Sequence, residues 1–298
     1  MVIIIDGNQL ACRCYFSLDK LTTSQGKRTE LIYGFLTSFR KLVKTYQDDD
    51  STFFLTWDGG NDKRKAIFPA YKAGRKAFED DFYTQLNDLR SIINFLGIKQ
   101  YHLKATEADD LIGTLTHKCR KKGKKVLIVS SDHDFEQLIS RHVKVLHPMG
   151  NNIIKDEQFV LDNYEITPDR LPEAMAIMGD PTDNIPGIES VGPKTASRLI
   201  VANGSLKNIL ENPDDLKIIN KKGVISPAKD DLKQKIKAGL EGIKISYQLV
   251  KICCDLDIEP DFSKQPQDFD KLLQVFEQLE FKVFVDEFER SWRKYFEI

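Results

Sequence analysis

Nine aspartate and glutamate residues stand where an α/β fold would bring their carboxylates to one place. They are Asp6, Asp58, Glu107, Asp109, Asp110, Asp132, Asp134, Asp180 and Asp183. Carboxylates gathered at close range raise one another's pKa unless a cation neutralises them. Mg²⁺ and similar hard cations take oxygen ligands of this kind. The residue types therefore predict a magnesium-type metal site.

Three of these acids end apolar runs that are typical of buried parallel strands, at residues 2–6, 52–58 and 126–132. In an open parallel sheet, ligand sites lie beyond the carboxyl ends of the strands. Strand and helix patterns alternate up to about residue 180, which predicts an α/β fold with a central, mostly parallel sheet flanked by helices. Helical patterns dominate afterwards. We therefore expect an α/β core over 1–180 and a helical C-terminal region over 181–298.

Helical spacing of apolar residues predicts the elements that surround the sheet. Helices are expected over 31–46, about 82–96, from 107 onward, about 135–139 and over 171–178. Thr106 is the expected N-cap of the third helix, whose first turn holds Glu107, Asp109 and Asp110. Acids at that position also suit the helix dipole, so this cluster alone would not require a metal.

The Asp132-His133-Asp134 sequence directly follows the third predicted strand. Residues two apart in extended chain point the same way, so one cation could take an oxygen from each acid. The alternative is a loop that only caps the next helix. The strand-end acids favour a metal role for this pair and for the helix-start cluster.

Residues 179–196 carry the most specific pattern, Gly-Asp-Pro-Thr-Asp-Asn-Ile-Pro-Gly-Ile-Glu-Ser-Val-Gly-Pro-Lys-Thr-Ala. The second half predicts a helix–hairpin–helix turn, in which Gly187 and Gly192 permit a tight backbone and Pro193 suits a first helical position. The backbone N–H groups that follow can hold a phosphate, and Lys194 adds charge without sequence preference. Such a motif positions a duplex by its backbone. The alternative is a plain helix hairpin.

Composition limits the class of protein. The chain has 298 residues, of which 41% are hydrophobic and 30% charged, as in ordinary globular proteins of one or two domains. The apolar start is too short for a signal peptide or a membrane span. Five cysteines form no CxxC pair, which favours reduced cytosolic thiols, and the five histidines lack zinc-ligand spacing.

The net charge of −1 conceals local patches. Residues 61–76 hold six basic residues and one acid, and residues 184–251 hold twelve basic and seven acidic residues. The tail, 252–298, holds six basic and twelve acidic residues. Acids at a metal site and basic residues elsewhere suit a polyanionic substrate, although each lysine run could equally be a solvated face.

In order along the chain, several motifs resemble the flap endonuclease and 5′→3′ exonuclease family. They are Asp6-Gly7, Asp58-Gly59-Gly60, the acidic run at 107–110, the Asp132/Asp134 pair and the motif at 179–187. That family includes stand-alone bacteriophage enzymes and the N-terminal nuclease domain of bacterial DNA polymerase I. The resemblance runs from Asp6 to about Leu199. Because no polymerase segment follows before Ile298, the free-standing form is expected.

The resemblance implies a PIN-like nuclease core and a two-metal, structure-specific 5′ nuclease. Such an enzyme hydrolyses phosphodiesters at 5′ flaps and 5′ ends of DNA or RNA–DNA hybrids, with RNase H activity, to remove primers and flaps in replication. It implies two Mg²⁺ ions, with Mn²⁺ able to substitute, and K⁺ held by backbone carbonyls at 187–192.

The resemblance also implies roles for particular residues. Asp6, Asp58, Glu107 and Asp109 would bind the first ion with Asp110 nearby, and Asp132, Asp134, Asp180 and Asp183 would bind or hydrate the second. Residues 69–75 resemble the start of a helical arch, expected over about 61–90, in which Lys72 and Arg75 touch the scissile phosphate and Tyr71 stacks on a base. Gly187, Val191, Gly192, Lys194 and Thr195 would contact DNA.

The expected partners are branched or 5′-flap DNA and RNA–DNA hybrids, with replication proteins as further candidates and no membrane. A monomer in the cytoplasm of a bacterium or a phage-infected cell is expected. Met175 stands where some phage members carry a basic residue, and His133 has no assigned role. The main alternative is a non-catalytic protein that binds branched DNA. A compact metal-dependent ribonuclease is a second alternative, but it would lack the hairpin at 187–196.

Overall fold

A computed structural model describes residues 1–48, 50–148 and 152–297. The chain forms two compact units. Unit 1 comprises residues 1–59, 77–131 and 254–298, and unit 2 comprises residues 60–76 and 132–253. The division expected at residue 180 followed a change in secondary-structure pattern along the chain. Spatial compactness groups the chain differently, because each unit is built from separate segments of the sequence.

The core of unit 1 is a parallel sheet in the order β3-β2-β1-β4. Its strands are β1 (Val2–Asp6), β2 (Thr52–Trp57), β3 (Lys99–His102) and β4 (Val126–Val129). Every residue of β1 is buried, as expected for a strand covered on both faces. The three predicted strands and the mostly parallel sheet are confirmed. The strand β3 was not predicted, because Lys-Gln-Tyr-His contains no apolar run.

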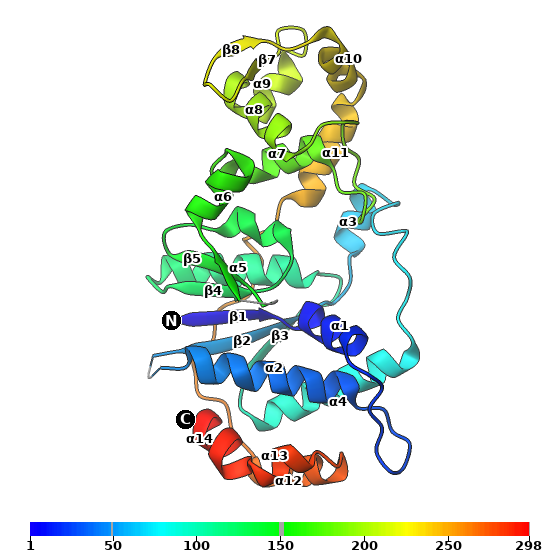
Figure 1. The fold of residues 1–298 in the computed structure, drawn as a ribbon, viewed down its shortest axis with the longest axis vertical. Helices are drawn as coiled ribbons and strands as arrows, with labels where there is room; N and C mark the ends of the chain where they lie inside the picture. Colours follow the sequence, from blue (N-terminus) through cyan, green and yellow to red (C-terminus); the bar gives the residue numbers. More distant parts are fainter. Residues whose placement is uncertain (49, 149–151, 298) are drawn as a thin grey trace. The chain divides into compact units, whose positions relative to one another are not determined.

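Helices cover both faces of this sheet (Figure 1). On one side lie α1 (Gly7–Ser17), α2 (Glu30–Tyr46) and α4 (Asp80–Phe95), and on the other lies α5 (Ala108–Lys121). The apolar face of α2 is fully buried at Phe35 and Phe39. The helices predicted over 31–46 and 82–96 are therefore confirmed to within two residues at each end.

The C-terminal segment forms an outer layer on α2 and α4 (Figure 1). It contains α12 (Phe269–Gln278), α13 (Lys282–Asp286), the π-helical η3 (Phe288–Arg293) and α14 (Lys294–Phe296). Its contacts are largely aromatic: the ring centroids of Tyr33 and Phe284 lie 4.8 Å apart, and those of Phe39 and Phe296 lie 5.6 Å apart. Aromatic burial thus holds this layer on unit 1.

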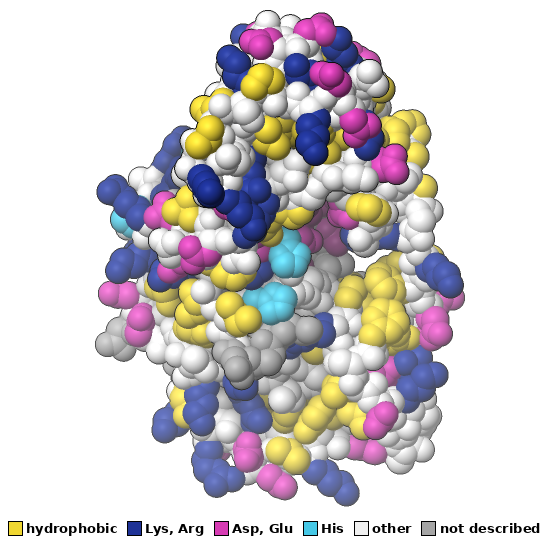
Figure 2. Space-filling model, turned by 45° about the horizontal axis from the view of Figure 1, so that its top comes forward, with side chains coloured by type: hydrophobic (Ala, Val, Ile, Leu, Met, Phe, Trp, Pro, Cys, Tyr) yellow, Lys and Arg dark blue, Asp and Glu magenta, His cyan; other side chains and the backbone are white. Residues whose placement is uncertain are grey.

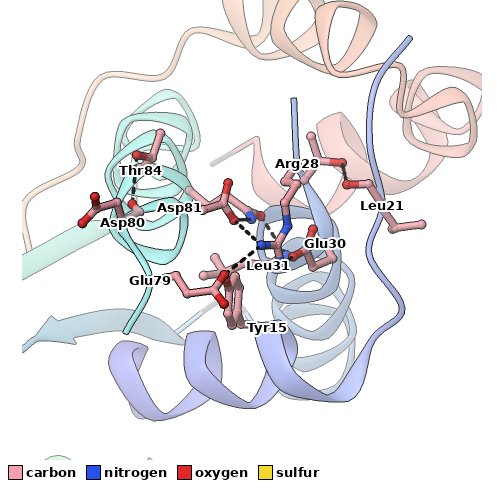
Figure 3. A network of polar contacts seen from close by, with 11 residues as sticks. Tyr15, Leu21, Arg28, Glu30, Leu31, Glu79, Asp80, Asp81 and Thr84 are labelled. Atoms are coloured by element: carbon pink, nitrogen blue, oxygen red, sulfur yellow. Dashed lines mark hydrogen bonds and ion pairs between the residues drawn. The ribbon is translucent and has the colours of Figure 1, made fainter. Parts of the chain in front are cut away.

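A polar network in unit 1 links the segment before α2 to the start of α4 (Figure 3). The Arg28 guanidinium pairs with the fully buried carboxylate of Glu30 and lies 3.2 Å from carboxylate oxygens of both Glu79 and Asp81. The Tyr15 hydroxyl donates to Glu79 at 3.1 Å, and the Arg28 guanidinium lies 5.0 Å from the Tyr15 ring centroid. The network therefore joins α1, α2 and α4 through one arginine.

Unit 2 is mostly helical. Its elements are α3 (Asp62–Ile67), the 3₁₀ helix η1 (His133–Leu138), β5 (Val143–His147), β6 (Ile153–Lys155), α6 (Glu157–Tyr164), the 3₁₀ helix η2 (Pro168–Arg170), α7 (Leu171–Met178), α8 (Pro193–Asn203), α9 (Leu206–Glu211), β7 (Lys217–Ile219), β8 (Ile225–Pro227), α10 (Asp230–Ala238) and α11 (Leu240–Val250). The strands pair antiparallel as β5–β6 and β7–β8, and α7 packs against both α8 and α11. The helical character of the region is confirmed, and the two antiparallel strand pairs were not predicted from the sequence.

The arch expected over about 61–90 is helical only at its two ends. Between α3 and α4, residues 69–74 form turns, and residues 68 and 75–79 have no regular structure. Across the described ranges, no helix is both long and apolar enough to cross a membrane. Cys14 and Cys119 are buried free thiols.

Candidate metal centre and nucleic-acid interface

In unit 1, Asp6 ends β1 and caps the helix that follows. One carboxylate oxygen accepts from the Gln9 backbone N–H at 2.9 Å, and the other accepts from the Ser130 hydroxyl at 3.1 Å. A Cβ at Gly7 would lie 2.6 Å from the Trp57 ring, so only glycine lets α1 begin so close to β2. The Asp6-Gly7 pair is thus needed for this turn, and it leaves the Asp6 carboxylate in one orientation.

Asp58 follows β2 and reaches the first turn of α5. Its carboxylate accepts from the Ala108 backbone N–H at 2.7 Å, and its own N–H donates to the Asn8 side chain at 2.9 Å. A Cβ at Gly59 would lie only 1.9 Å from the Leu103 carbonyl oxygen. Gly59 therefore permits the close backbone approach that brings Asp58 to the acid-bearing helix.

The acidic run at 107–110 begins α5. Glu107 is the N-cap of α5, so the expected cap at Thr106 was wrong by one residue. Glu107 and Asp110 are buried, and Asp109 is half-buried. Buried carboxylates at a helix N-terminus are favoured by the helix dipole. Unit 1 thus places Asp6, Asp58 and the start of α5 at the carboxyl ends of its strands, as the sequence predicted.

In unit 2, Asp132 and Asp134 begin η1. The Asp132 carboxylate caps η1 by accepting from the Asp134 N–H at 2.9 Å, so the capping role weighed from the sequence is real. Burial, followed by the charges of Asp132, Asp180 and Asp183, raises the pKa of Asp134 to about 8. A carboxyl group with such a pKa sits where added positive charge would be strongly favourable.

The loop that holds Asp180 and Asp183 contacts the turn at residues 68–75. The Lys72 N–H donates to the Asp183 carbonyl at 2.9 Å, and the Asn184 amide donates to the Ala70 carbonyl at 2.8 Å. The Arg75 Nε donates to an Asp183 carboxylate oxygen at 2.9 Å. Two motifs more than 100 residues apart in the chain are therefore joined within unit 2.

Lys72 has a left-handed backbone with φ of 56°, and its Nζ lies 3.6 Å from the Asp183 carboxylate. Backbone strain of this kind persists only where the surroundings hold it. Tyr71 is 3% exposed, so its ring packs inside unit 2 and is not available in this conformation for the expected base stacking. Arg64 is also buried and donates from Nε to the Leu249 carbonyl at 2.9 Å, which removes it from the basic surface at 61–76.

The helix–hairpin–helix segment depends on two glycines. A Cβ at Gly187 would lie 1.9 Å from the Met178 carbonyl oxygen, and Gly179 has φ of +67° with no room for a Cβ. Gly192 has ordinary extended backbone and open space around its Cα, so the expected requirement for glycine there was wrong. Pro193 begins α8 as predicted, and Gly192 is its N-cap.

Two hollows in unit 2 lie beside these residues. One, of about 500 Å³, is lined by residues from Met178 to Gly192, including Gly187 and Val191. The other, of about 350 Å³, is lined by Asp132, Asp134 and Asp180 together with His133, Tyr164 and Met175. The second hollow brings three of the predicted metal ligands to one surface.

Within the ranges that the structure describes, no three His, Cys, Asp or Glu side chains are arranged so that they could hold a metal ion as they stand. Carboxylates repel one another without a cation, and Asp183 is instead engaged by Arg75 and Lys72. The donor set itself, which is all carboxylate oxygen, suits Mg²⁺ or Mn²⁺.

The basic surface at 184–251 is more mixed than its composition indicates. Figure 2 shows Lys and Arg side chains interspersed with Asp and Glu over the upper part of unit 2. Lys235 lies 3.1 Å from Asp231, and Lys217 lies 3.6 Å from Asp215. Lys194 at the start of α8 is exposed, with its Nζ 3.8 Å from Glu165. The alternative of a solvated face therefore holds for part of this surface.

Some residues beside the site were missed in the sequence. Asn8 and Ser130 orient Asp58 and Asp6, and Glu136 with Lys155 forms a buried ion pair next to Asp134. Asn8 could have been inferred from its position in the first turn after a strand-end acid. The ion pair could not have been inferred, because Glu136 and Lys155 belong to different elements and the sequence does not show that these elements pack together.

Comparison with known protein families shows which family the chain belongs to. Residues 1–165 match the 5′-3′ exonuclease N-terminal resolvase-like domain, and residues 166–279 match the 5′-3′ exonuclease C-terminal SAM fold. The chain therefore belongs to the 5′-3′ exonuclease family. This confirms the resemblance seen in the motifs and extends it well past Leu199.

Two relatives represent a protein of similar length and a much longer one. A 5′-3′ exonuclease of Aquifex aeolicus is 34% identical over 295 residues, which are 98% of this chain and 96% of the relative. The thermostable DNA polymerase I of Thermus thermophilus is 35% identical over 289 residues, 96% of this chain and 33% of the relative. The chain thus spans about a third of the length of the polymerases it matches.

Solved structures confirm the fold. The bacteriophage T5 flap endonuclease in complex with DNA and metal ions has a TM-score of 0.68 at 17% identity, covering 100% of this chain and 99% of that one. The catalytic core of Rad2 with a DNA substrate has a TM-score of 0.59 at 15% identity, covering 93% and 86%. Both are similar in fold to this chain.

Proposed function

We propose that this protein is a structure-specific 5′ nuclease that hydrolyses phosphodiesters at 5′ flaps and 5′ ends with the help of divalent cations. The observation that carries the proposal is the junction in unit 2, where the turn bearing Lys72 and Arg75 is bonded to the loop bearing Asp180 and Asp183. Cationic side chains beside clustered carboxylates are what a phosphate and its metal ions together require.

Two groups of carboxylates would hold the metal ions, Mg²⁺ by preference and Mn²⁺ as a substitute. Asp6, Asp58, Glu107 and Asp109 of unit 1, with Asp110 nearby, would serve one ion, and Asp132, Asp134, Asp180 and Asp183 of unit 2 would serve the other. Bound divalent cations supply a water nucleophile at neutral pH and charge stabilisation on the phosphate.

Lys72 and Arg75 would bind the scissile phosphate and stabilise the charge that develops there. A positioned donor of this kind is typically worth about 3–4 kcal/mol in the transition state. Both cations already contact a carboxylate, Asp183, so exchange of that contact for a phosphate oxygen costs little reorganisation. Water is the expected nucleophile.

The substrate would be duplex DNA with a 5′ single-stranded end, or an RNA–DNA hybrid of that shape. The loop 187–192 and the N-terminus of α8 present backbone N–H groups and Lys194, which suit a phosphate of a duplex. Backbone carbonyls of the same loop would hold K⁺. The T5 and Rad2 relatives were solved with DNA, and this supports the assignment.

Primer or flap removal in replication is the biological role we propose, by a monomer in the cytoplasm that could act with replication proteins. Relatives named 5′-3′ exonuclease and DNA polymerase I support that role.

The substrate assignment is tested by comparing substrates of one sequence. A 5′-end-labelled flap, the corresponding single strand, an unbranched duplex and a matching RNA–DNA flap are incubated with the protein and Mg²⁺. We expect cleavage near the branch of both flaps. Equal cleavage of single-stranded DNA and the flap would contradict structure specificity, and binding of the flap without any cleavage would favour the non-catalytic alternative.

A further inference from the structure

A buried pair of opposite charges lies next to the Asp132/Asp134 pair in unit 2. The Glu136 side chain on η1 is fully buried, and the Lys155 side chain on β6 is only 4% exposed. The Lys155 ammonium pairs with the same Glu136 oxygen that lies 2.9 Å from the His133 Nδ1. The ammonium also lies 5.2 Å from the Phe159 ring centroid. Neither charged residue has a part in the function proposed above.

The fully buried Glu136 carboxylate meets both the Lys155 ammonium and the His133 Nδ1. Loss of Lys155 would leave this buried carboxylate without its ammonium partner. A buried charge in that situation is strongly destabilised. The pair is thus one cooperative unit that ties η1 to β6.

The side chain of the next residue, Gln137, also holds η1 in position through hydrogen bonds. Its amide nitrogen donates to the Asp134 carbonyl at 2.9 Å and to the Val250 carbonyl at 3.0 Å, and its oxygen accepts from the Ile252 N–H at 3.0 Å. Two consecutive side chains therefore hold a six-residue 3₁₀ helix from two directions. Short 3₁₀ helices have poor hydrogen-bond geometry of their own, so this one depends on such contacts.

We propose that Glu136 and Lys155 are positioning residues, which hold η1 so that the Asp132 and Asp134 carboxylates can bind one divalent cation together. The inference rests on the proposed function of these two acids. Mg²⁺ requires near-ideal geometry, so small displacements of a ligand-bearing segment weaken its binding. Partners that orient ligating carboxylates typically change metal affinity or activity 10–100-fold when they are mutated. In this arrangement His133 completes the contact to Glu136.

The direct test is Lys155→Met, with metal binding measured without DNA. Electron paramagnetic resonance of free Mn²⁺ reports the dissociation constant, which we expect to rise 10–100-fold at one site. The single-turnover rate of flap cleavage in Mg²⁺ should fall by a similar factor. DNA affinity in Ca²⁺ should stay within about twofold. Lys155→Arg, which keeps the charge and the reach, should restore most of the Mn²⁺ affinity.

The matched control is Lys144→Met on neighbouring β5. Lys144 is also paired with a carboxylate, Asp156, but at 3.7 Å and with about half of its side chain exposed. It should change neither measurement. If Lys155→Met does not fold, the double variant Lys155→Met with Glu136→Gln removes both buried charges and should fold with the same loss of Mn²⁺ affinity.

A role of Lys155 through its charge alone and a role in positioning η1 predict opposite changes in Mn²⁺ affinity. Removal of a cation near the acids would tighten Mn²⁺ binding if Lys155 acted only through its charge. A folded Lys155→Met or double variant with unchanged or tighter Mn²⁺ binding therefore overturns the proposal. If the unaltered protein cleaves no flap but Lys155→Met still weakens Mn²⁺ binding, the nuclease assignment fails and the positioning role stands.

Discussion

At the scale of single residues, Asp134 shows how strongly the acids of unit 2 act on one another. Burial and three neighbouring aspartates raise its pKa to about 8. An isolated aspartate would ionise near pH 4, so this position opposes a lone negative charge. The charge of Lys72 lowers the pKa of Asp134, but by less than burial and the neighbouring aspartates raise it. A divalent cation would reverse the balance, which is a physical reason to concentrate carboxylates here.

The substitution Asp134→Asn tests this residue. It keeps the shape of the side chain but removes a negative oxygen, so metal binding should weaken while the fold is retained. We expect the single-turnover rate of flap cleavage to fall at least about 100-fold, and DNA affinity in Ca²⁺ to change little. Full magnesium-dependent activity in Asp134→Asn would remove this residue from the metal site.

The substitution Lys72→Ala tests the phosphate contact. Loss of a positioned cation should slow the single-turnover rate about 100-fold, whereas duplex affinity should fall much less. Lys76→Ala, at an exposed lysine four residues along, is the control and should stay near the unaltered rate. An unchanged rate for Lys72→Ala, or an equal loss in both variants, would contradict a specific role for Lys72.

The positions of some site residues could be predicted from the sequence, and those of others could not. The difference is whether local chain structure or tertiary packing fixes the position. The strand-end acids Asp6 and Asp58 could be assigned, because the carboxyl ends of parallel strands meet at one edge. The contact of Lys72 and Arg75 with Asp183 could not, since it joins segments that are remote in the chain. The burial of Tyr71 could not be foreseen either, and its role in base stacking stays a prediction.

At the scale of elements, the loop between α7 and α8 depends on close backbone approach. Ile188 donates to the Ile177 carbonyl at 2.8 Å, and Gly187 lies directly against Met178. Gly187→Ala should therefore displace the loop, lower the stability by about 1–3 kcal/mol and weaken duplex binding. Thermal unfolding and DNA binding in Ca²⁺ measure the two effects.

Gly242→Ala on α11 is the control for that change. A Cβ there would lie 3.5 Å from the Pro186 Cβ, which is an ordinary contact, and alanine favours a helix. It should leave stability and DNA binding unchanged or slightly improved. Normal duplex binding by Gly187→Ala would show that the loop does not need its close approach.

The network around Arg28 predicts a second effect on an element (Figure 3). Glu30→Ala removes the buried partner of Arg28 and should lower the free energy of unfolding by about 3 kcal/mol. Glu289→Ala removes an exposed partner of Arg293 and should cost at most about 1 kcal/mol. Equal melting temperatures for the two variants would show that the network adds nothing to stability.

Elements with a clear apolar period could be predicted from the sequence, and those without one could not. The helix α2 and the strand β1 follow such patterns closely. The strand β3 is short and polar, and the strands β7 and β8 have only three residues each, so only pairing with neighbouring chain makes them strands. The expected arch was too helical because residues 68–79 are ordered by tertiary contacts instead of helical spacing.

At the scale of the whole molecule, the chain passes between its two units four times. The nine predicted carboxylates are divided between the units, five in unit 1 and four in unit 2. Neither compact unit therefore carries the complete set. We propose that the reaction requires both groups, so loss of one acid from either group should abolish it.

The most direct test of the central claim is the magnesium dependence of cleavage by the unaltered protein. A 5′-end-labelled DNA flap is incubated with the protein in Mg²⁺ and, in parallel, in EDTA, and the product ends are mapped. We expect cleavage near the branch in Mg²⁺ and an intact, still bound flap after chelation. Cleavage that persists in EDTA, or a flap that is bound but never cut in Mg²⁺ or Mn²⁺, would contradict it.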